Sequence, residues 1–105
     1  MNNYIMEKHK PINVCISCIN EDTMKLSMTL MDNRFCYDEY LFNFARLANK
    51  FKSNISMEAH GKNLNAKYIL YLFCLSLVAE TEITIIAKGE DSKEAVDQLK
   101  EYLLR

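Results

Sequence analysis

The stretch from Phe51 to Asp91 constrains the fold more than any other part of this chain. Three strand-like runs lie in it: residues 54–59 (NISMEA), residues 63–65 after a His-Gly turn, and the β-branched run 82–88 (EITIIAK). Between the second and third runs, residues 66–75 are apolar enough to predict a short buried helix. Strands that alternate in this way with turns and a short helix predict an α+β fold with an antiparallel sheet.

The flanking segments complete this pattern. Alternating apolar residues predict strands over residues 12–19 and 23–31, joined as a hairpin, and the first strand is expected to have one better buried face. Apolar residues three and four apart predict a helix over residues 38–50. A last helix is predicted to begin at Asp91, with Glu94 as the partner in a capping box.

Composition narrows the class of function. The chain has 105 residues, 13 basic and 14 acidic, and a formal net charge of -1, so no concentrated basic face for nucleic acid is predicted. The longest apolar run, residues 69–78, is about half the length needed to span a bilayer, and no secretory leader is recognisable. We therefore expect a cytoplasmic protein with neither membrane nor nucleic-acid contacts.

Two of the four cysteines, Cys15 and Cys18, form a single C-x-x-C. A closed zinc site needs four ligands, and the two histidines, His9 and His60, lie far apart in the sequence. The pair also lacks the helix-opening context of redox-active cysteines. We expect free thiols and no cofactor, while a metal or redox module built on Cys15 and Cys18 remains an alternative.

Three runs of residues resemble HPr, the small histidine phosphocarrier of the bacterial phosphotransferase system that drives sugar transport. They are FKSNI at 51–55, GKNLNAK at 61–67 and ETEITIIAKGEDSKEAV at 80–96, and the resemblance extends over about residues 24–105 without a gap. It implies an open-faced β-sandwich, an antiparallel sheet with its core strands in the order 1-4-2-3 and three helices on one face.

The resemblance also divides the chain. Residues 23–105 would form the HPr-like domain, and residues 1–22 would be an N-terminal extension. Because the first strand of the HPr sheet lies at an edge, residues 12–19 could pair with it and add a further strand there.

In the HPr family the first helix opens with Gly-Leu-His-Ala-Arg-Pro, whose histidine accepts phosphate beside the arginine and free backbone N–H groups. Counting back from Phe51, the motif falls on residues 35–40, and none of it is kept: Tyr37 stands at the histidine, Glu39 at the arginine and Tyr40 at the proline. A tyrosine is a far poorer acceptor than a partly unprotonated imidazole, and Glu39 reverses the charge beside the phosphate.

Other residues are not expected to restore the lost chemistry. His9, in the extension, and His60, in a distant turn, lie too far along the chain to replace the histidine. Tyr68 stands where Gram-positive relatives carry a regulatory serine. The sequence therefore predicts a protein that is not an enzyme, has lost phosphocarrier activity and acts as a protein-binding or regulatory module. A divergent but working phosphocarrier component is the alternative.

The surface of the short helix is the best candidate for such binding. A helix lying on a sheet buries one face, which leaves apolar residues pointing outward. Phosphotransferase-system components or regulators, or a second copy bound through residues 68–73, are the expected partners. Alternatively, residues 1–22 fold over this helix. The candidate contact residues are Tyr40, Tyr68, Leu70, Tyr71 and Phe73.

Overall fold

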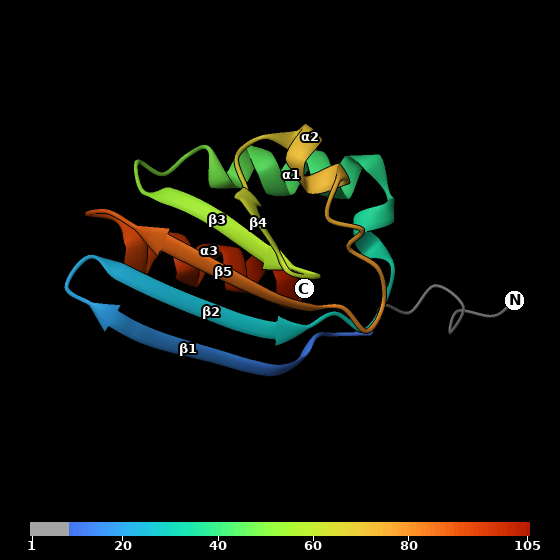
Figure 1. Ribbon diagram of the computed structural model, residues 1–105, viewed down its shortest axis with the longest axis horizontal. Coiled ribbons are helices and arrows are strands. Elements are labelled where there is room, and N and C mark those ends of the chain that lie inside the picture. Colours follow the sequence, from blue (N-terminus) through green and yellow to red (C-terminus); the bar gives the residue numbers. More distant parts are fainter. Residues whose placement is uncertain (1–8) are drawn as a thin grey trace, which may run out of the picture.

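The computed structural model, which describes residues 9–105, contains a five-stranded antiparallel sheet in the order β1-β2-β5-β3-β4 (Figure 1). The strands β2, β5, β3 and β4 reproduce the predicted 1-4-2-3 order. The strand β5 pairs along its whole length with β2 on one side, and its residues Thr84 to Lys88 pair with β3 on the other. The bounds of the strands are β1 Ile12–Asn20, β2 Thr23–Thr29, β3 Asn54–Ala59, β4 Lys62–Asn65 and β5 Glu82–Lys88.

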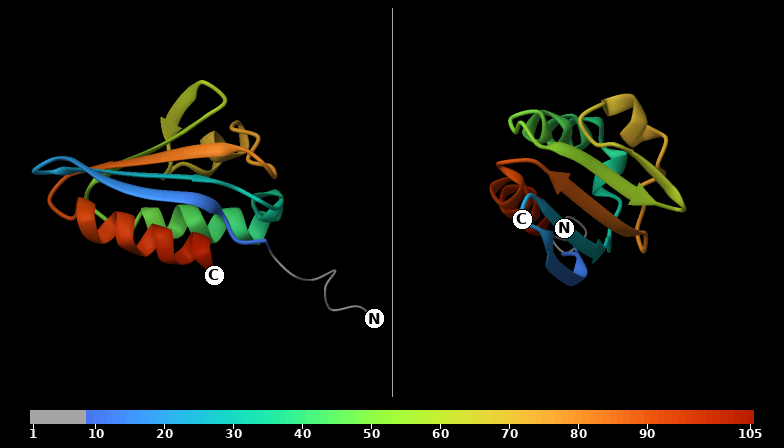
Figure 2. Two further views of the ribbon diagram at one scale, coloured as in Figure 1. Left: turned by 90° about the horizontal axis from the view of Figure 1, so that it is seen from below. Right: turned by 60° about the vertical axis from the view of Figure 1, so that its left-hand side comes forward.

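The helices lie on one side of this sheet, as predicted. Figure 2 shows the two longer helices, α1 and α3, side by side beneath it, and the core between the layers includes the fully buried Phe44, Met57, Ile85 and Leu99. None of the helices within residues 9–105 is long and apolar enough to cross a bilayer. The helical elements are η2 Arg34–Cys36, α1 Asp38–Ala48, α2 Ile69–Phe73 and α3 Ser92–Leu104.

The strand β1 forms the outer edge of the sheet, beside β2. The prediction that one face of this strand is better buried is wrong, because every residue of β1 except the half-buried Ser17 is exposed. The helix α3 packs against β2 and β5, so the helical layer ends there and β1 extends past it. At the opposite edge of the sheet α2 contacts β4, so β1 does not cover α2 (Figure 1). Residues 1–8 of the extension lie outside the described residues.

The junction before α3 also differs from the prediction. Asp91 is the N-cap residue of α3, but its side chain makes no capping hydrogen bond and the capping box with Glu94 does not form. Instead its carboxylate accepts hydrogen bonds from the backbone N–H of Lys52 at 2.8 Å and of Ser53 at 2.9 Å, and from the Ser53 hydroxyl. The bond from the Ser53 hydroxyl, with the backbone N–H bonds, lowers the pKa of Asp91. A Cβ on Gly89, whose φ is +151°, would lie 2.8 Å from Ser53 Cα.

Candidate functional site

The segment from Arg34 to Tyr40 leads into α1 and contains the positions matched to the family's phosphorylation motif. The short helix η2 ends at Tyr37, which is also the N-cap residue of α1. The first intrahelical bond runs from the backbone N–H of Leu41 to the carbonyl of Tyr37 at 3.1 Å, and no side chain caps the helix. The side chain of Tyr37 is 72% exposed. Sequence reasoning thus placed Tyr37 correctly at the start of a helix.

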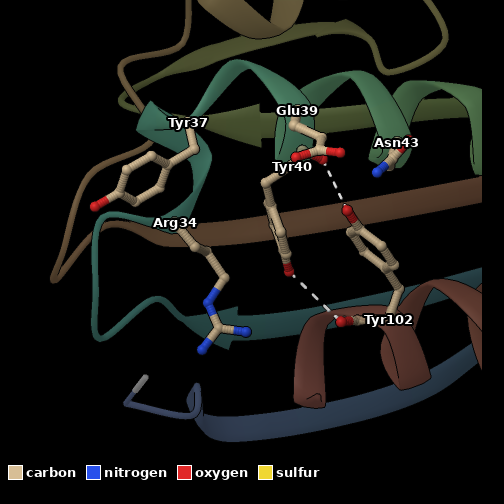
Figure 3. Close-up of a pocket in the computed structure, with 6 residues that line it drawn as sticks. All are labelled: Arg34, Tyr37, Glu39, Tyr40, Asn43 and Tyr102. Atoms are coloured by element: carbon tan, nitrogen blue, oxygen red, sulfur yellow. Dashed lines mark hydrogen bonds between the residues drawn. The ribbon is translucent and has the colours of Figure 1, made fainter. Parts of the chain in front are cut away.

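A hollow of about 320 Å³ lies beside this helix start (Figure 3). It brings together the three positions matched to the family's histidine, arginine and proline. Sequence reasoning did not single out the other three residues that line the hollow. The full lining is Arg34, Tyr37, Glu39, Tyr40, Asn43 and Tyr102.

Arg34 is the residue that sequence reasoning missed most clearly, because residues 32–34 were interpreted only as a break after β2. It is 3% exposed, and its guanidinium lies between α1 and the end of α3. Its Nε and Nη2 atoms each donate a hydrogen bond to one carboxylate oxygen of Asp32, both at 2.8 Å. The other donors reach the backbone oxygens of Leu103 at 3.2 Å, Arg105 at 2.9 Å and His9 at 3.2 Å.

All five N–H donors of the Arg34 guanidinium are therefore bound within the chain. The hydrogen bond to Asp32 is the main cause that raises the pKa of Arg34. Burial on its own would raise the pKa of Asp32, but hydrogen bonds from the side chain and backbone of Arg34, and its charge, bring that pKa below the ordinary value. Arg34 could contact a phosphate in the hollow only by giving up one of these bonds.

Tyr40 and Tyr102 join α1 to α3 next to Arg34 (Figure 3). The Tyr102 hydroxyl donates to the carbonyl of Tyr40 at 2.8 Å, and the Tyr40 hydroxyl donates to the carbonyl of Tyr102 at 3.5 Å. Their ring centroids are 4.7 Å apart, and Phe35 meets Tyr40 edge to face at 5.0 Å. Burial raises the pKa of both hydroxyls, that of Tyr102 to about 12. Tyr40, predicted as a contact residue, is half-buried in this cluster.

The structure corrects the placement of one histidine. His9 was expected to lie far from the site, but its backbone N–H donates to Asp32 at 3.0 Å and its carbonyl accepts from Arg34. His9 therefore borders the ion pair that flanks the hollow. Sequence distance misled here because the extension runs back along β2 before it reaches residue 9. His60 lies in the β3–β4 turn, with Nε2 3.0 Å from the carbonyl oxygen of Ser76.

The short helix α2 presents the expected apolar side chains to solvent. Leu72 is buried, whereas Leu70 is 71% exposed, and the rings of Tyr68 and Tyr71 meet edge to face with centroids 5.3 Å apart. The segment before the helix is fixed to the end of α1, because the Asn49 side chain donates to the carbonyl of Lys67 at 2.8 Å. The exposed large apolar residues of α2 and of the segments on either side of it are Tyr68, Leu70, Tyr71, Phe73 and Val78.

Cys15 and Cys18 do not form a pair. Cys15 lies opposite Ser27 and Cys18 opposite Met24 in the β1–β2 register, so their side chains are on opposite faces of β1. Across residues 9–105, no group of three or more potential metal-ligating side chains comes together. All four cysteines are free thiols.

The fold and the hollow at the start of α1 define a domain of the phosphocarrier type. A model of the family described as "PTS HPr component phosphorylation site" matches residues 42–104. The HPr-like protein Crh of Bacillus subtilis is 43% identical over 60 residues, which are 57% of this chain and 71% of Crh. This chain belongs to the HPr family.

Solved structures support the same assignment. A phosphocarrier protein HPr from Bacillus anthracis superposes with a TM-score of 0.69 at 27% identity, over 79% of this chain and 99% of that protein. A crystal structure of B. subtilis Crh gives a TM-score of 0.59 at 39% identity, over 64% of this chain and 77% of that one. That Crh structure is described as a catabolite repression protein in an intertwined, domain-swapped dimer.

Proposed function

We propose that this chain is a protein-binding, regulatory member of the HPr family that no longer carries phosphate on a histidine. The observation that carries the proposal is the composition of the hollow: an exposed tyrosine where the family has its histidine, and Glu39 where it has its arginine. The family match begins at Phe42, just past these positions.

The electrostatics of the helix start oppose phosphate transfer. A phosphoryl group approaching Tyr37 would meet the carboxylates of Asp38 and Glu39 in the first turn of α1. These carboxylates offset the favourable N-terminal end of the helix dipole. Arg34, the nearby cation that lines the hollow, has all its donors engaged elsewhere. These charges favour neither the bound phosphate nor the transition state that leads to it.

Incubation with phosphoenolpyruvate, enzyme I and labelled phosphate tests the loss of activity. We expect no acid-labile label under conditions that fully label a histidine-containing HPr run in parallel. Stoichiometric acid-labile labelling of this chain would refute the proposal.

A working phosphocarrier with a displaced histidine is the second candidate, favoured by the position of His9 beside Asp32 and Arg34. If label were incorporated, His9→Ala and His60→Ala would decide between the two histidines. Label lost only in His9→Ala would establish a displaced site, whereas retention of label in both variants would exclude either histidine as the acceptor.

We propose the exposed side of α2 as the contact surface for protein partners. The resemblance to HPr implies that enzyme I and permease components contact this helix and the start of α1, and Crh, 43% identical over 60 residues, is described as a catabolite repression protein. The apolar residues of α2 suit such a contact, with either a phosphotransferase-system protein or a second copy through residues 68–73.

Titration calorimetry with enzyme I tests this surface. Leu70→Ser should weaken binding at least tenfold, because an exposed apolar anchor is lost while the core is untouched. Ile19→Ser, a change at an exposed apolar residue on β1, is the matched control and should leave the affinity unchanged. Equal effects of the two variants would contradict the assignment to α2.

A further inference from the structure

The outer edge of β1 is a sheet edge that carries neither charged side chains nor proline. It is nine residues long, and its backbone groups have no partner strand among residues 9–105. Natural edge strands commonly carry charged residues or proline, but the segment Ile12–Asn20 contains neither. Irregularities fall between Ile12 and Cys15 and between Cys18 and Asn20, which leaves a regular run from Cys15 to Cys18.

The side chains of β1 give this edge an apolar stripe. Ile16 lies opposite the buried Leu26 and Cys18 opposite Met24, so both face the helical side of the sheet, and Val14 shares this side by alternation. On β2 the same side is covered by α3, but β1 extends past the helix. Val14 and Ile16 therefore remain exposed on the side of the sheet where β2, β5 and β3 carry buried residues.

We propose that β1 pairs antiparallel with β1 of a second copy of this chain, about a twofold axis through Ile16. Residues opposite each other in an antiparallel pair share a face, so a symmetric pairing must set residues of the same face together. Pairing about Ile16 sets the two Ile16 side chains against each other and each Val14 against Cys18 of the second copy. The stripe is then apolar throughout, and Cys15 meets Ser17 on the other face.

The charges at the two ends of β1 also favour a second copy of the chain as the partner of this edge. The residues before β1 include Lys10, and those after it are Glu21 and Asp22, all exposed. Antiparallel pairing about Ile16 brings the basic end of one copy to the acidic end of the other. A second copy therefore supplies opposite charges at both ends and no charge between them, which a strand chosen at random would not.

Strand pairing alone makes a small interface. A strand of this length extends about 30 Å, and the area it covers lies below that of standard stable complexes. We expect a dimer that dissociates on dilution. This inference concerns the edge opposite α2 and holds whether or not the chain accepts phosphate.

Sedimentation equilibrium of the full chain over a range of concentrations tests the proposal. The expected mass rises with concentration towards twice the 12.3 kDa of the chain. Ile16→Lys should hold the mass at that of the monomer, because it sets two like charges against each other at the axis. Leu70→Ser, on α2, should leave the dimer intact. A monomer at every concentration, or a dimer that survives Ile16→Lys, would overturn the proposal.

Disulfide trapping tests the register without a charged substitution. In a background with all four cysteines replaced by serine, Ile16→Cys should give a covalent dimer on mild oxidation with diamide, since residues opposite each other have Cβ atoms close enough for a disulfide. Phe42→Cys in the same background, exposed on α1, is the control and should stay monomeric. Failure of Ile16→Cys to cross-link, or equal cross-linking of both, contradicts pairing at β1.

Discussion

The two ends of the α1–α3 helix pair are each tied by an aspartate, but in different ways. At one end the half-buried Asp91 accepts hydrogen bonds from the neutral groups of Lys52 and Ser53. At the other end Asp32 holds the buried guanidinium of Arg34, which bridges to the last residues of α3. The first tie lies within the stretch that resembles HPr most closely, whereas the second lies beside the residues matched to the family's phosphorylation motif.

The comparison shows how the cation beside the start of α1 is used. The resemblance to HPr implies that the arginine of the family's motif contacts the phosphate on the histidine. In this chain the cation that lines the hollow, Arg34, binds groups of the chain itself. Its position at the carbonyl end of α3 is favourable for the helix dipole. The tie at Asp91 joins a carboxylate to neutral donors, whereas the tie at Asp32 is an ion pair with Arg34. The predictions below test this contrast, beginning with the largest effect.

Arg34→Ala should lower the free energy of unfolding by about 4 kcal/mol, because it leaves the carboxylate of Asp32 and three backbone oxygens without their donor in a largely buried place. Urea denaturation followed by circular dichroism measures this. Arg46→Ala, on the exposed side of α1, is the control and should change it by less than about 0.5 kcal/mol. A similar small loss for both variants would show that Arg34 is not a structural tie.

Asp32→Asn should cause a smaller loss at neutral pH, because the amide oxygen can still accept from Arg34. It should also change the response to acid. The folded-state pKa of Asp32 is lowered, so its contribution is present above the unfolded value of about 3.9 and is lost as pH falls through the folded value. Below about pH 4 the unfolding free energy of the variant should fall less steeply than that of the wild type. Parallel curves would contradict the assigned role.

Gly89→Ala tests the other end. The added Cβ would meet the backbone of Ser53 and the φ of +151° is strained for alanine, so we expect a loss of about 2 kcal/mol. Gly61→Ala is the matched control, since its φ is +77° but no atom lies within 4 Å of the added Cβ. It should cost about 1 kcal/mol from backbone strain alone. Equal losses would mean that Gly89 is needed only for its conformation, not for the close approach to Ser53.

The sequence predicted what depends on local pattern. Strand order, the β3–β4 turn and the outward residues of α2 follow from periodicity and from the resemblance to HPr. The two aspartate ties could not be predicted in this way, because Asp91 and Ser53 are 38 residues apart and Arg34 and Leu103 are 69 apart. For the same reason the local pattern predicts Asp91 as a helix cap and marks Asp32 only as a break after the second strand. The exposure of β1 was missed because alternation predicts a strand but not where the helical layer above it ends.

Tyr102→Phe sharpens the contrast at the Arg34 end and should have the smallest effect. It removes the 2.8 Å hydrogen bond to the carbonyl of Tyr40, so we expect a loss of about 1 kcal/mol at neutral pH. Tyr68→Phe, an exposed change on the segment before α2, is the control and should be neutral within about 0.5 kcal/mol.

Alkaline pH tests the burial of the Tyr102 hydroxyl. The folded-state pKa of Tyr102 is raised to about 12, above an unfolded value of about 10, so its contribution is complete below pH 10 and is lost as pH rises through 12. Between these values the unfolding free energy should fall less steeply in Tyr102→Phe than in the wild type. If the two fell together, the Tyr102 hydroxyl would not be buried in the folded chain in the way that its raised pKa requires.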